Sequence, residues 1–493
     1  MSAQASSRVY DVAIKTPLEF AVKSSGASGS AVYLKREDLQ PVHSFKLRGA
    51  YNKISQLTKD ERGRGVIAAS AGNHAQGVAL AAQKLGIDAL VVMPRTTPSI
   101  KIDAVKAYGA TVELAGDNYS EAAEHCKQRI RETGRTFIHP FDDPLVIAGQ
   151  GTIGQEILEQ LPDVTHIFVP VGGGGLIAGI AQHVKKLRPD IQIISVEPQD
   201  SNALQASIRQ NERVTLPHVG IFADGVAVKQ IGETTFKITQ KTVDDFITVT
   251  TDQICAAIKS IFEDTRSIVE PAGALALAGI VQYDLPKNAR AVAICSGANM
   301  TFERLGQVAE RTLLGSGREI VLGIELPEAP GALAKFCTEV VNGHTINEFS
   351  YRKAAENAAH AFIGLAVNDA PDKQHLMDKL HNHDYTYTDF SGSDVAKEHT
   401  RHMIGGRTTT AIHEHIYEVT FPERPRALAD FLHAIGHTWN ISLFHYRSAA
   451  SDYGKVLIGF ETVDQKALEA KLRSVGFDFM QADADASLKF FIR

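Results

Sequence analysis

The sequence predicts an α/β protein whose long first part holds a parallel sheet and whose last part consists of two related α+β modules. From about residue 30 to 300, apolar strand-like runs alternate with helical stretches. Within these runs apolar and polar residues do not alternate, which is typical of parallel strands buried on both faces. A chain of 493 residues is also too long for one ordinary domain.

Each apolar run of the first part leads into a stretch with helical spacing. The expected pairs of strand and helix are 66–69 with 74–85, 89–93 with 99–108, 111–114 with 119–132, and 166–171 with 177–187; further strands are expected at 191–196 and 291–295, and a last helix at 302–313. Three polar or glycine-rich motifs begin where such a strand ends, at Ser70, Gly172 and Ser296. Ligands of parallel sheets bind beyond the carboxyl ends of the strands, so we expect these motifs to form one composite site.

The last part of the chain contains an internal repeat. Pro327–Phe336 matches Pro422–Phe431, and Phe349–Arg352 matches Phe444–Arg447. Positions 327 and 422 differ by 95, and so do positions 349 and 444. One constant offset across two separated matches indicates a duplicated unit.

These patterns set the expected domain boundaries. We expect a first domain over residues 1–314 and two modules over 319–394 and 414–486. Gly315–Gly317 is a short hinge, and residues 397–411 join the two modules.

Composition excludes several classes of protein. The net charge of −6 gives no reason to expect nucleic acid or an anionic membrane as a partner. The four cysteines lie far apart without CxxC spacing, so we expect reduced thiols, and no metal-ligand cluster is visible. The polar start lacks the apolar stretch of a secretory signal, and no apolar run is long enough to cross a bilayer. A cytoplasmic location is expected.

One lysine stands out as a candidate for covalent catalysis. Lys46 lies between Phe45 and a helix-forming stretch, just after Ser44 as a cap. A lysine held in this way can form a Schiff base with an aldehyde cofactor. Taken alone, the segment also fits the start of an ordinary surface helix.

Four successive glycines form the second motif. Gly172, Gly173, Gly174 and Gly175 follow a strand and open a helix at Leu176. Glycines let the backbone approach a phosphate closely, and the helix N-terminus adds a favourable dipole. A flexible linker is the alternative, but both flanks have structured patterns. No Walker lysine follows, which argues against a nucleotide-binding P-loop.

These motifs, with the loop Ser70-Ala71-Gly72-Asn73-His74 and the segment 296–299, resemble the pyridoxal-phosphate enzymes of fold type II, the tryptophan-synthase-beta class. The segments 41–51 and 222–229 are most similar to the biosynthetic threonine dehydratases, which are threonine ammonia-lyases. The order of elements in each repeat resembles the α+β, ferredoxin-like ACT module. A pair of ACT-like modules after the catalytic part is the arrangement of the isoleucine-regulated biosynthetic form.

The resemblance implies a role for each motif. Lys46 would hold pyridoxal 5'-phosphate and act as the base that takes the α-proton of threonine, while Phe45 packs near the cofactor ring or simply in the core. Gly172 to Leu176 would bind the phosphate. The loop Ser70-Ala71-Gly72-Asn73-His74 would bind the substrate carboxylate through backbone N–H groups, with Asn73 on the ring hydroxyl or acting as a helix cap. Ser296 would face the pyridine nitrogen as a neutral partner.

Two further features carry no settled role. Glu270 begins a family-like segment, but its carboxylate has either a structural role or a place near the cofactor. His43, His74 and His139 lie near motifs, and coincidence explains this in a chain with 19 histidines.

The repeated half is expected to regulate the enzyme. Tyr351 and Tyr446 occupy equivalent positions, and the resemblance places them in effector sites where isoleucine inhibits and valine opposes it. Gly331 of the first copy is Arg426 in the second, which would block or retune the second site. The alternative is that the repeats serve only oligomerisation. By resemblance the protein is a homotetramer.

Two rival interpretations stay open from the sequence. A degradative serine/threonine dehydratase or a serine racemase shares the catalytic motifs but normally lacks paired regulatory modules. A non-catalytic amino-acid sensor would share the fold, although the intact Lys46, glycine motif and Ser296 argue against it.

Overall fold

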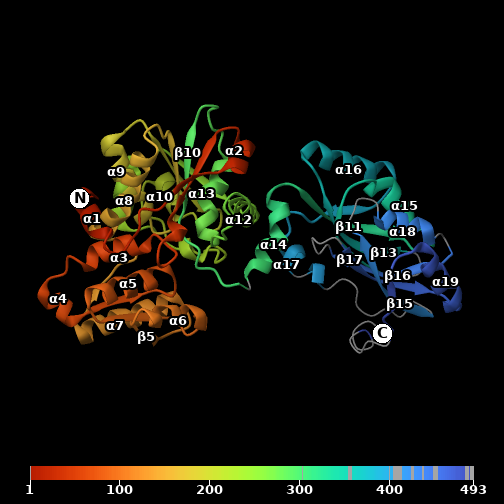
Figure 1. Ribbon diagram of the computed structural model, residues 1–493, viewed down its shortest axis with the longest axis horizontal. Helices are drawn as coiled ribbons and strands as arrows, with labels where there is room; N and C mark the ends of the chain where they lie inside the picture. The colour runs from red at the N-terminus through yellow and green to blue at the C-terminus, as the bar shows by residue number, and fades with distance from the viewer. Residues whose placement is uncertain are drawn as a thin grey trace. The chain divides into compact units, whose positions relative to one another are not determined.

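The computed structural model divides into two compact units, Met1–Gly315 and Ser316–Arg493 (Figure 1). The residues that it describes are 2–302, 304–353, 358–398, 400–402, 413–422, 427–435, 438–447, 453–483 and 488. The boundary between the units falls at the expected glycine hinge. Within these ranges, no helix combines the length and the apolar character that a membrane span requires.

The first unit contains two sheets. The six-stranded sheet has the order β1 (Leu18–Phe20), β2 (Ala31–Arg36), β10 (Arg290–Cys295), β7 (His166–Pro170), β8 (Gln192–Pro198) and β9 (Asp245–Val249). The four-stranded sheet has the order β5 (Thr111–Leu114), β4 (Ala89–Met93), β3 (Val66–Ala69) and β6 (Thr136–Phe137). All neighbouring strands are parallel except the β1–β2 pair. The predicted parallel strands are therefore confirmed, and the structure adds that they divide between two sheets.

The helices of the first unit follow the strands as predicted. They are α1 (Ser2–Val9), α2 (Val22–Ser28), α3 (Lys46–Ile54), α4 (Lys59–Arg64), α5 (Asn73–Leu85), α6 (Ser99–Ala107), α7 (Tyr119–Thr133), α8 (Pro144–Gln160), α9 (Gly175–Leu187), α10 (Ala203–Gln210), α11 (Glu233–Thr242), α12 (Thr251–Thr265), α13 (Pro271–Gln282) and α14 (Arg304–Gly315), with short 3-10 turns at Glu37–Leu39 and Asp224–Val226. Predicted helix boundaries differ from these by one or two residues.

Local signals set where the helices begin. Asp143 caps α8, because its carboxylate accepts hydrogen bonds from the N–H groups of Leu145 and Val146, and Pro144 supplies the first helical position. Thr58 and Glu61 form a reciprocal capping box at α4.

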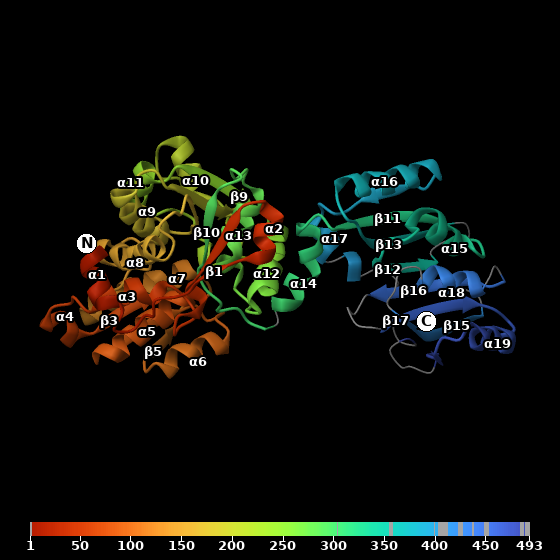
Figure 2. The same ribbon diagram turned by 45° about the horizontal axis from the view of Figure 1, so that its top comes forward.

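Helix α3 lies between the two sheets and contacts both layers. It packs against α5, which covers β3 and β4 of the four-stranded sheet, and against α8 on the side of the six-stranded sheet. Figure 2 shows α3 between α5 and α8. The start of α3 is therefore held by both halves of the first unit.

The second unit contains one antiparallel sheet built from the two repeats. The first copy comprises β11 (Glu319–Pro327), α15 (Ala332–Phe336), a π-helical turn (Cys337–Val341), β12 (Ile346–Lys353), β13 (Ala358–Ala366), α16 (Ala370–Asn382) and β14 (Tyr387–Asp389). The second comprises β15 (Glu414–Pro422), α18 (Ala427–Ile435), β16 (Asn440–Arg447), β17 (Tyr453–Glu461), α19 (Gln465–Val475) and β18 (Phe479–Gln481). Helix α17 (Asp394–Glu398) and a 3-10 turn (Thr400–His402) lie between the copies in the sequence.

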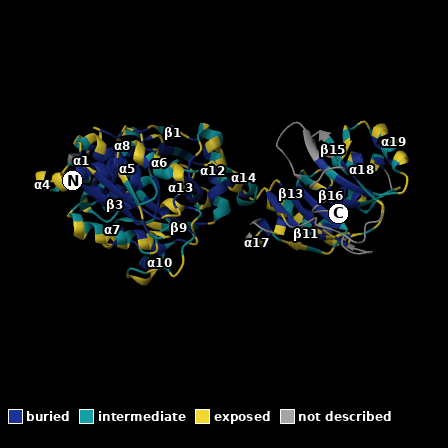
Figure 3. Ribbon diagram, turned by 90° about the horizontal axis from the view of Figure 1, so that it is seen from below, coloured by how far each residue is buried: buried dark blue, intermediate teal, exposed yellow. Residues whose placement is uncertain are grey.

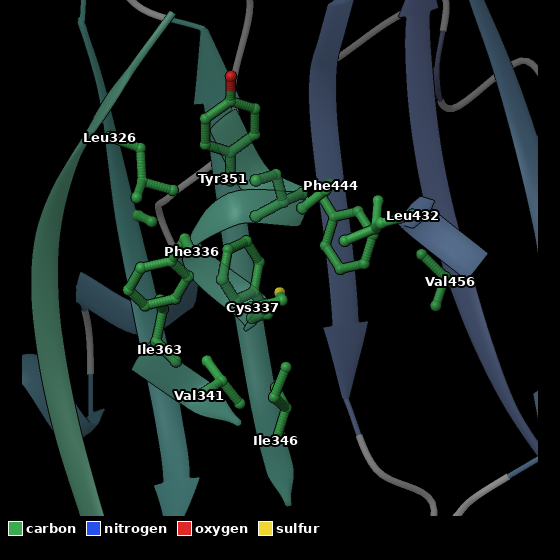
Figure 4. Close-up of a cluster of buried hydrophobic side chains, with 14 of the residues drawn as sticks. Leu326, Phe336, Cys337, Val341, Ile346, Tyr351, Ile363, Leu432, Phe444 and Val456 are labelled. Atoms are coloured by element: carbon green, nitrogen blue, oxygen red, sulfur yellow. The ribbon is translucent and has the colours of Figure 1, made fainter. Parts of the chain in front are cut away.

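Each copy has the predicted order strand, helix, strand, strand, helix, strand. The eight strands run in the order β14-β11-β13-β12-β16-β17-β15-β18, so the copies join through β12 and β16. Phe349 pairs with Tyr446 and Tyr351 with Phe444 across this junction. The rings of Phe349 and Phe444 pack edge to face with 5.2 Å between their centroids, and residues of both copies belong to one hydrophobic cluster. Figure 4 shows Phe444 of the second copy within this cluster.

Burial follows the layers. Figure 3 shows buried strands inside each unit and exposed residues along outer helices such as α7 and α19. In α7 only Ala122 and Cys126 are buried, whereas every residue of β3, β4 and β7 is buried. All four cysteines are buried, and none of them is in a disulfide.

Candidate active site and effector site

Lys46 is the first residue of α3 and reaches into a cavity between the two sheets. Its Nζ donates a hydrogen bond to the Pro140 carbonyl at 3.0 Å and lies 5.3 Å from the centre of the Phe45 ring. Burial lowers the pKa of Lys46 to about 8, although the Glu270 carboxylate opposes this shift. About a tenth of the amine is therefore uncharged at pH 7, far more than for an ordinary lysine, and this uncharged form is the one that acts as a nucleophile or a base.

The cavity gathers residues from seven separated segments. It has about 430 Å³ of empty space, part of it open to solvent. Its lining consists of Phe45, Lys46, Asn73, Phe141, Pro170, Gly172, Gly173, Gly174, Gly175, Leu176, Gly225, Val226, Glu270, Ala272 and Ser296. The composite site that the motif positions predicted is present in the fold.

Backbone contacts hold the first and last motifs side by side. The N–H of Phe45 donates to the Ser296 carbonyl at 3.2 Å, and Ser44 forms an isolated antiparallel bridge with Gly297. Lys46 is thereby fixed next to the end of β10.

The four glycines form the turn between β7 and α9. Gly174 has φ +88°, a left-handed conformation that favours glycine, and it caps α9. A Cβ at Gly173 would lie 2.2 Å from the Phe141 ring, so any side chain at this position would clash with Phe141. The first N–H groups of α9 have no partner within the helix and face this end of the cavity, which suits a phosphate. The linker alternative is therefore wrong.

Asn73 and Glu270 meet although 197 positions separate them. The Asn73 amide donates to Glu270 Oε1 at 2.6 Å and accepts from the Asn299 amide at 2.7 Å. Burial is the main cause that raises the pKa of Glu270 to about 7, and the nearby Asp224 carboxylate raises it further. Glu270 thus belongs to the cavity, which decides between the two roles that the sequence left open.

The remaining residues of the Ser70–His74 loop do not all face the cavity. Ser70, Ala71 and Gly72 are partly exposed after β3 and lie outside the cavity lining. His74 is buried, and its Nε2 lies 2.7 Å from the Ile138 carbonyl oxygen. Burial lowers the pKa of His74 to about 3, so its ring is neutral and serves packing. Any contact of His74 with a substrate would come from its backbone.

Ser296 also lines the cavity. Its hydroxyl donates to the Ala272 carbonyl at 3.2 Å. The hydroxyl must turn away from Ala272 to donate to a ring nitrogen, which rotation about one bond allows.

Six lining residues were not assigned to the site from the sequence. Phe141, Pro170, Gly225, Val226 and Ala272 were not singled out as site residues, and Glu270 had no assigned function. The similarity of segment 222–229 to one enzyme family was the available signal for Gly225 and Val226. Phe141 carries no motif, and only its packing against Gly173 and Gly175 reveals it.

These residues fit pyridoxal phosphate. The cavity offers a buried amine for the aldehyde, backbone N–H groups at a helix N-terminus for the phosphate, and a neutral hydroxyl for the ring nitrogen. No group of His, Cys, Asp and Glu side chains among the described residues has the arrangement of a metal site.

The second unit contains a cavity shared by the two copies. It has about 430 Å³ of empty space, including open solvent. The first copy contributes Leu326, Pro327, Ala329, Gly331, Ala332, Leu333, Ala334 and Tyr351, and the second contributes Leu432, Ile435, Trp439, Asn440 and Ile441.

Polar groups gather at the Tyr351 end of this shared cavity. The Tyr351 hydroxyl lies 2.7 Å from Glu328 Oε1 and 2.9 Å from the Ile441 carbonyl oxygen. The Asn440 amide lies 3.1 Å from Glu328 Oε2 and 2.7 Å from Glu461 Oε2. Figure 4 shows the Tyr351 hydroxyl pointing away from the apolar cluster.

The two predicted effector tyrosines differ in position. Tyr351 lines the shared cavity, whereas Tyr446 pairs with Phe349 in the sheet and is not among the lining residues. Arg426 lies outside the described residues.

Family comparisons match both units. Residues 9–297 match the family of the pyridoxal-phosphate dependent enzyme, and residues 310–400 and 405–492 match the C-terminal regulatory domain of threonine dehydratase. The chain is 46% identical over 494 residues to a biosynthetic L-threonine dehydratase from Burkholderia multivorans, covering 98% of this chain and 97% of the relative.

Solved structures resemble the chain over nearly two thirds of its length. The processed form of threonine deaminase isoform 2 from Solanum lycopersicum has a TM-score of 0.62 and 50% identity, covering 63% of this chain and 87% of that one. Maize serine racemase has a TM-score of 0.60 and 33% identity, covering 64% of this chain and 98% of that one. The regulatory matches extend beyond the part that a racemase covers. The chain therefore belongs to the family of biosynthetic threonine dehydratases, pyridoxal-phosphate-dependent lyases that carry a C-terminal regulatory domain.

Proposed function

We propose that this chain converts L-threonine to 2-oxobutanoate and ammonia, as the first step of isoleucine biosynthesis, and that isoleucine inhibits it. Residues 1–314 would be the catalytic part, and 319–394 and 414–486 the regulatory modules of a cytoplasmic homotetramer. The observation that carries the proposal is the cavity that joins the buried Lys46 amine, the glycine turn and the Ser296 hydroxyl.

Different residues of the cavity have different roles in the reaction. Bound pyridoxal phosphate supplies an electron sink that lowers the cost of removing the α-proton. Lys46 holds the cofactor and then takes that proton on Nζ, for which its lowered pKa suits it. Gly172–Gly175 bind the phosphate, and the backbone of the Ser70–His74 loop, of which Asn73 lines the cavity, holds the substrate carboxylate. The β-hydroxyl departs as water, and the released enamine takes up water to give 2-oxobutanoate and ammonia.

The proposed activity is tested by measuring 2-oxo acid formation from L-threonine with and without L-isoleucine. We expect formation of 2-oxobutanoate that isoleucine suppresses. The same assay with L-serine, read out as D-serine, tests the racemase alternative. If the holoprotein released no 2-oxo acid and no D-serine, the amino-acid sensor would replace the lyase.

We further propose that isoleucine occupies the shared cavity of the regulatory unit. Its apolar side chain would lie against Leu432, Ile435 and Trp439, and its ammonium group would bind the Glu328 carboxylate beside Tyr351. A charged ammonium prefers a carboxylate partner, and such hydrogen bonds are roughly twice as strong as neutral ones. Valine would enter the same cavity with one methylene less.

Replacing Glu328 with glutamine tests this assignment. The amide keeps the shape but loses the charge, so half-inhibition should require roughly 10- to 100-fold more isoleucine, corresponding to about 1.5–3 kcal/mol. The activity without isoleucine should stay at the wild-type level. Inhibition curves at fixed threonine measure the shift.

Tyrosine variants distinguish the two copies. Tyr351→Ala should weaken inhibition strongly, and Tyr446→Ala should weaken it less, because Tyr446 lies outside the cavity lining. Unchanged isoleucine curves for both variants would leave the repeats with a role in oligomerisation only.

A further inference from the structure

The loop Ile221–Val226 forms one wall of the candidate active site. Gly225 and Val226 line the cavity, and a Cβ at Gly225 would lie 3.4 Å from Glu270 Oε1. A Cβ at Gly172 would lie 2.8 Å from the Cα of Val226. The loop therefore touches both the phosphate turn and Glu270, and a shift of the loop changes the shape of the cavity.

Two cationic side chains hold this loop from outside the cavity. Lys101 Nζ lies 2.8 Å from Asp224 Oδ2. Arg304 donates to the Ile221 carbonyl at 3.1 Å, and its guanidinium carbon lies 5.2 Å from the centre of the Phe222 ring. Arg304 Nη1 is also 4.0 Å from Asp224 Oδ1.

The two cations come from different parts of the first unit. Lys101 lies on α6, which follows β4 of the four-stranded sheet, whereas the loop follows β8 of the six-stranded sheet. The pair Lys101–Asp224 therefore links α6, beside the four-stranded sheet, to the loop that follows the six-stranded sheet's β8. Asp224 is 42% exposed and Lys101 20%, so the pair is weak and can open and close.

Arg304 lies at the start of the helix that leads into the regulatory unit. It is the first residue of α14, the last helix of the first unit, and the chain enters the second unit at Ser316. Helix α14 packs on α12, where the Thr312 hydroxyl lies 3.3 Å from the Cys255 carbonyl oxygen. Figures 1 and 2 both show α14 beside α12. Arg304 thus connects α14 to the loop.

We propose that Lys101 and Arg304 are positioning residues that hold the loop Ile221–Val226 over the active site, and that α14 transmits effector binding to this loop through Arg304. The proposed transmission through Arg304 rests on the proposed isoleucine regulation. Lys101 holds the loop in this position over the cavity. Arg304, on α14, couples the position of the loop to the regulatory unit.

Hydrogen exchange of the full-length protein tests whether Lys101 and Arg304 hold the loop Ile221–Val226. Lys101→Met and Arg304→Met should each speed exchange of the amides of residues 221–227 at least threefold, with and without the cofactor. Lys106→Met on α6 and Gln307→Met on α14 replace exposed residues of the same helices and should leave exchange unchanged. If the amides exchanged in both variants at the rates seen in these controls, neither Lys101 nor Arg304 would hold the loop.

Kinetic measurements with and without isoleucine test whether α14 transmits effector binding through Arg304. Lys101→Met should raise KM for threonine about three- to tenfold with kcat nearly unchanged. Arg304→Met should in addition shift half-inhibition by isoleucine at least threefold, whereas Gln307→Met should not. An isoleucine response of Arg304→Met identical to that of Gln307→Met would overturn the coupling.

The same experiments separate this inference from the function on which it rests. If wild-type enzyme deaminated threonine but ignored isoleucine, the coupling through α14 would fall together with the proposed regulation. The exchange measurement would still decide whether Lys101 and Arg304 hold the loop, because it needs neither turnover nor effector.

Discussion

Lys46→Ala is expected to lower kcat for L-threonine by roughly 10³-fold or more, because it removes both the covalent attachment of the cofactor and a positioned base. No other described lysine lines the cavity. Turnover is measured as 2-oxo acid released by enzyme saturated with pyridoxal phosphate. Mass spectrometry after borohydride reduction should find the pyridoxyl group on the peptide containing Lys46 in the wild type and should not find it in the variant.

Lys59→Ala provides the matched control for this variant. Lys59 is an exposed lysine at the start of α4 in the same part of the chain, so its removal should change neither turnover nor labelling. Near-normal turnover of Lys46→Ala, or labelling of a different lysine, would contradict the assignment of Lys46 as the cofactor-bearing residue.

Arg48→Met is expected to destabilise the protein by about 3–5 kcal/mol, because it leaves the buried Glu37 carboxylate without its ion-pair partner and removes one of the two partners of Glu156. Arg48 Nη2 lies 2.7 Å from Glu37 Oε1 and Nη1 lies 2.6 Å from Glu156 Oε1, and all three side chains are fully buried. Lys35 also pairs with Glu156, at 2.5 Å. Lys35 alone cannot compensate the charges of both carboxylates. Because Arg48 is only two residues from Lys46, its replacement should also shift the start of α3.

Urea unfolding at a fixed protein concentration measures the effect of Arg48→Met. The midpoint should fall markedly, and the affinity for pyridoxal phosphate should weaken with it. Arg188→Met is the control: the Arg188–Asp190 pair is 2.6 Å long but exposed, so its loss should hardly move the midpoint. A midpoint for Arg48→Met equal to that of Arg188→Met would show that the buried network contributes little.

The local part of the fold was predictable from the sequence. The predicted strands 66–69, 89–93 and 111–114 coincide with β3, β4 and β5. The continuous apolar runs of β3 and β4 are buried on both faces, as expected, whereas the residues of the edge strand β5 are partly or fully exposed. The repeat offset of 95 predicted the second module: β11 begins at Glu319 and β15 at Glu414. These features follow from patterns that a single chain displays directly.

The placement of the site followed from the same patterns only in outline. Because strand ends meet at one edge of a sheet, the motifs after β3, β7 and β10 were expected together, and the cavity contains Asn73, Gly172 and Ser296. The direction of each side chain was not predictable. His74 belongs to the same loop as Asn73 but turns into the core, since its ring finds the Ile138 carbonyl there.

The sequence by itself determined the element types, the motif order, the repeat and the candidate lysine. Only the tertiary structure decided that the parallel strands form two sheets with α3 between them, that Asn73 meets Glu270, and that both copies share one cavity at Tyr351. The physical reason is the range of the interactions. Periodicity and turn residues act over a few positions, whereas these contacts join segments 90 or more positions apart, such as Tyr351 with Ile441, and arise only when the layers pack.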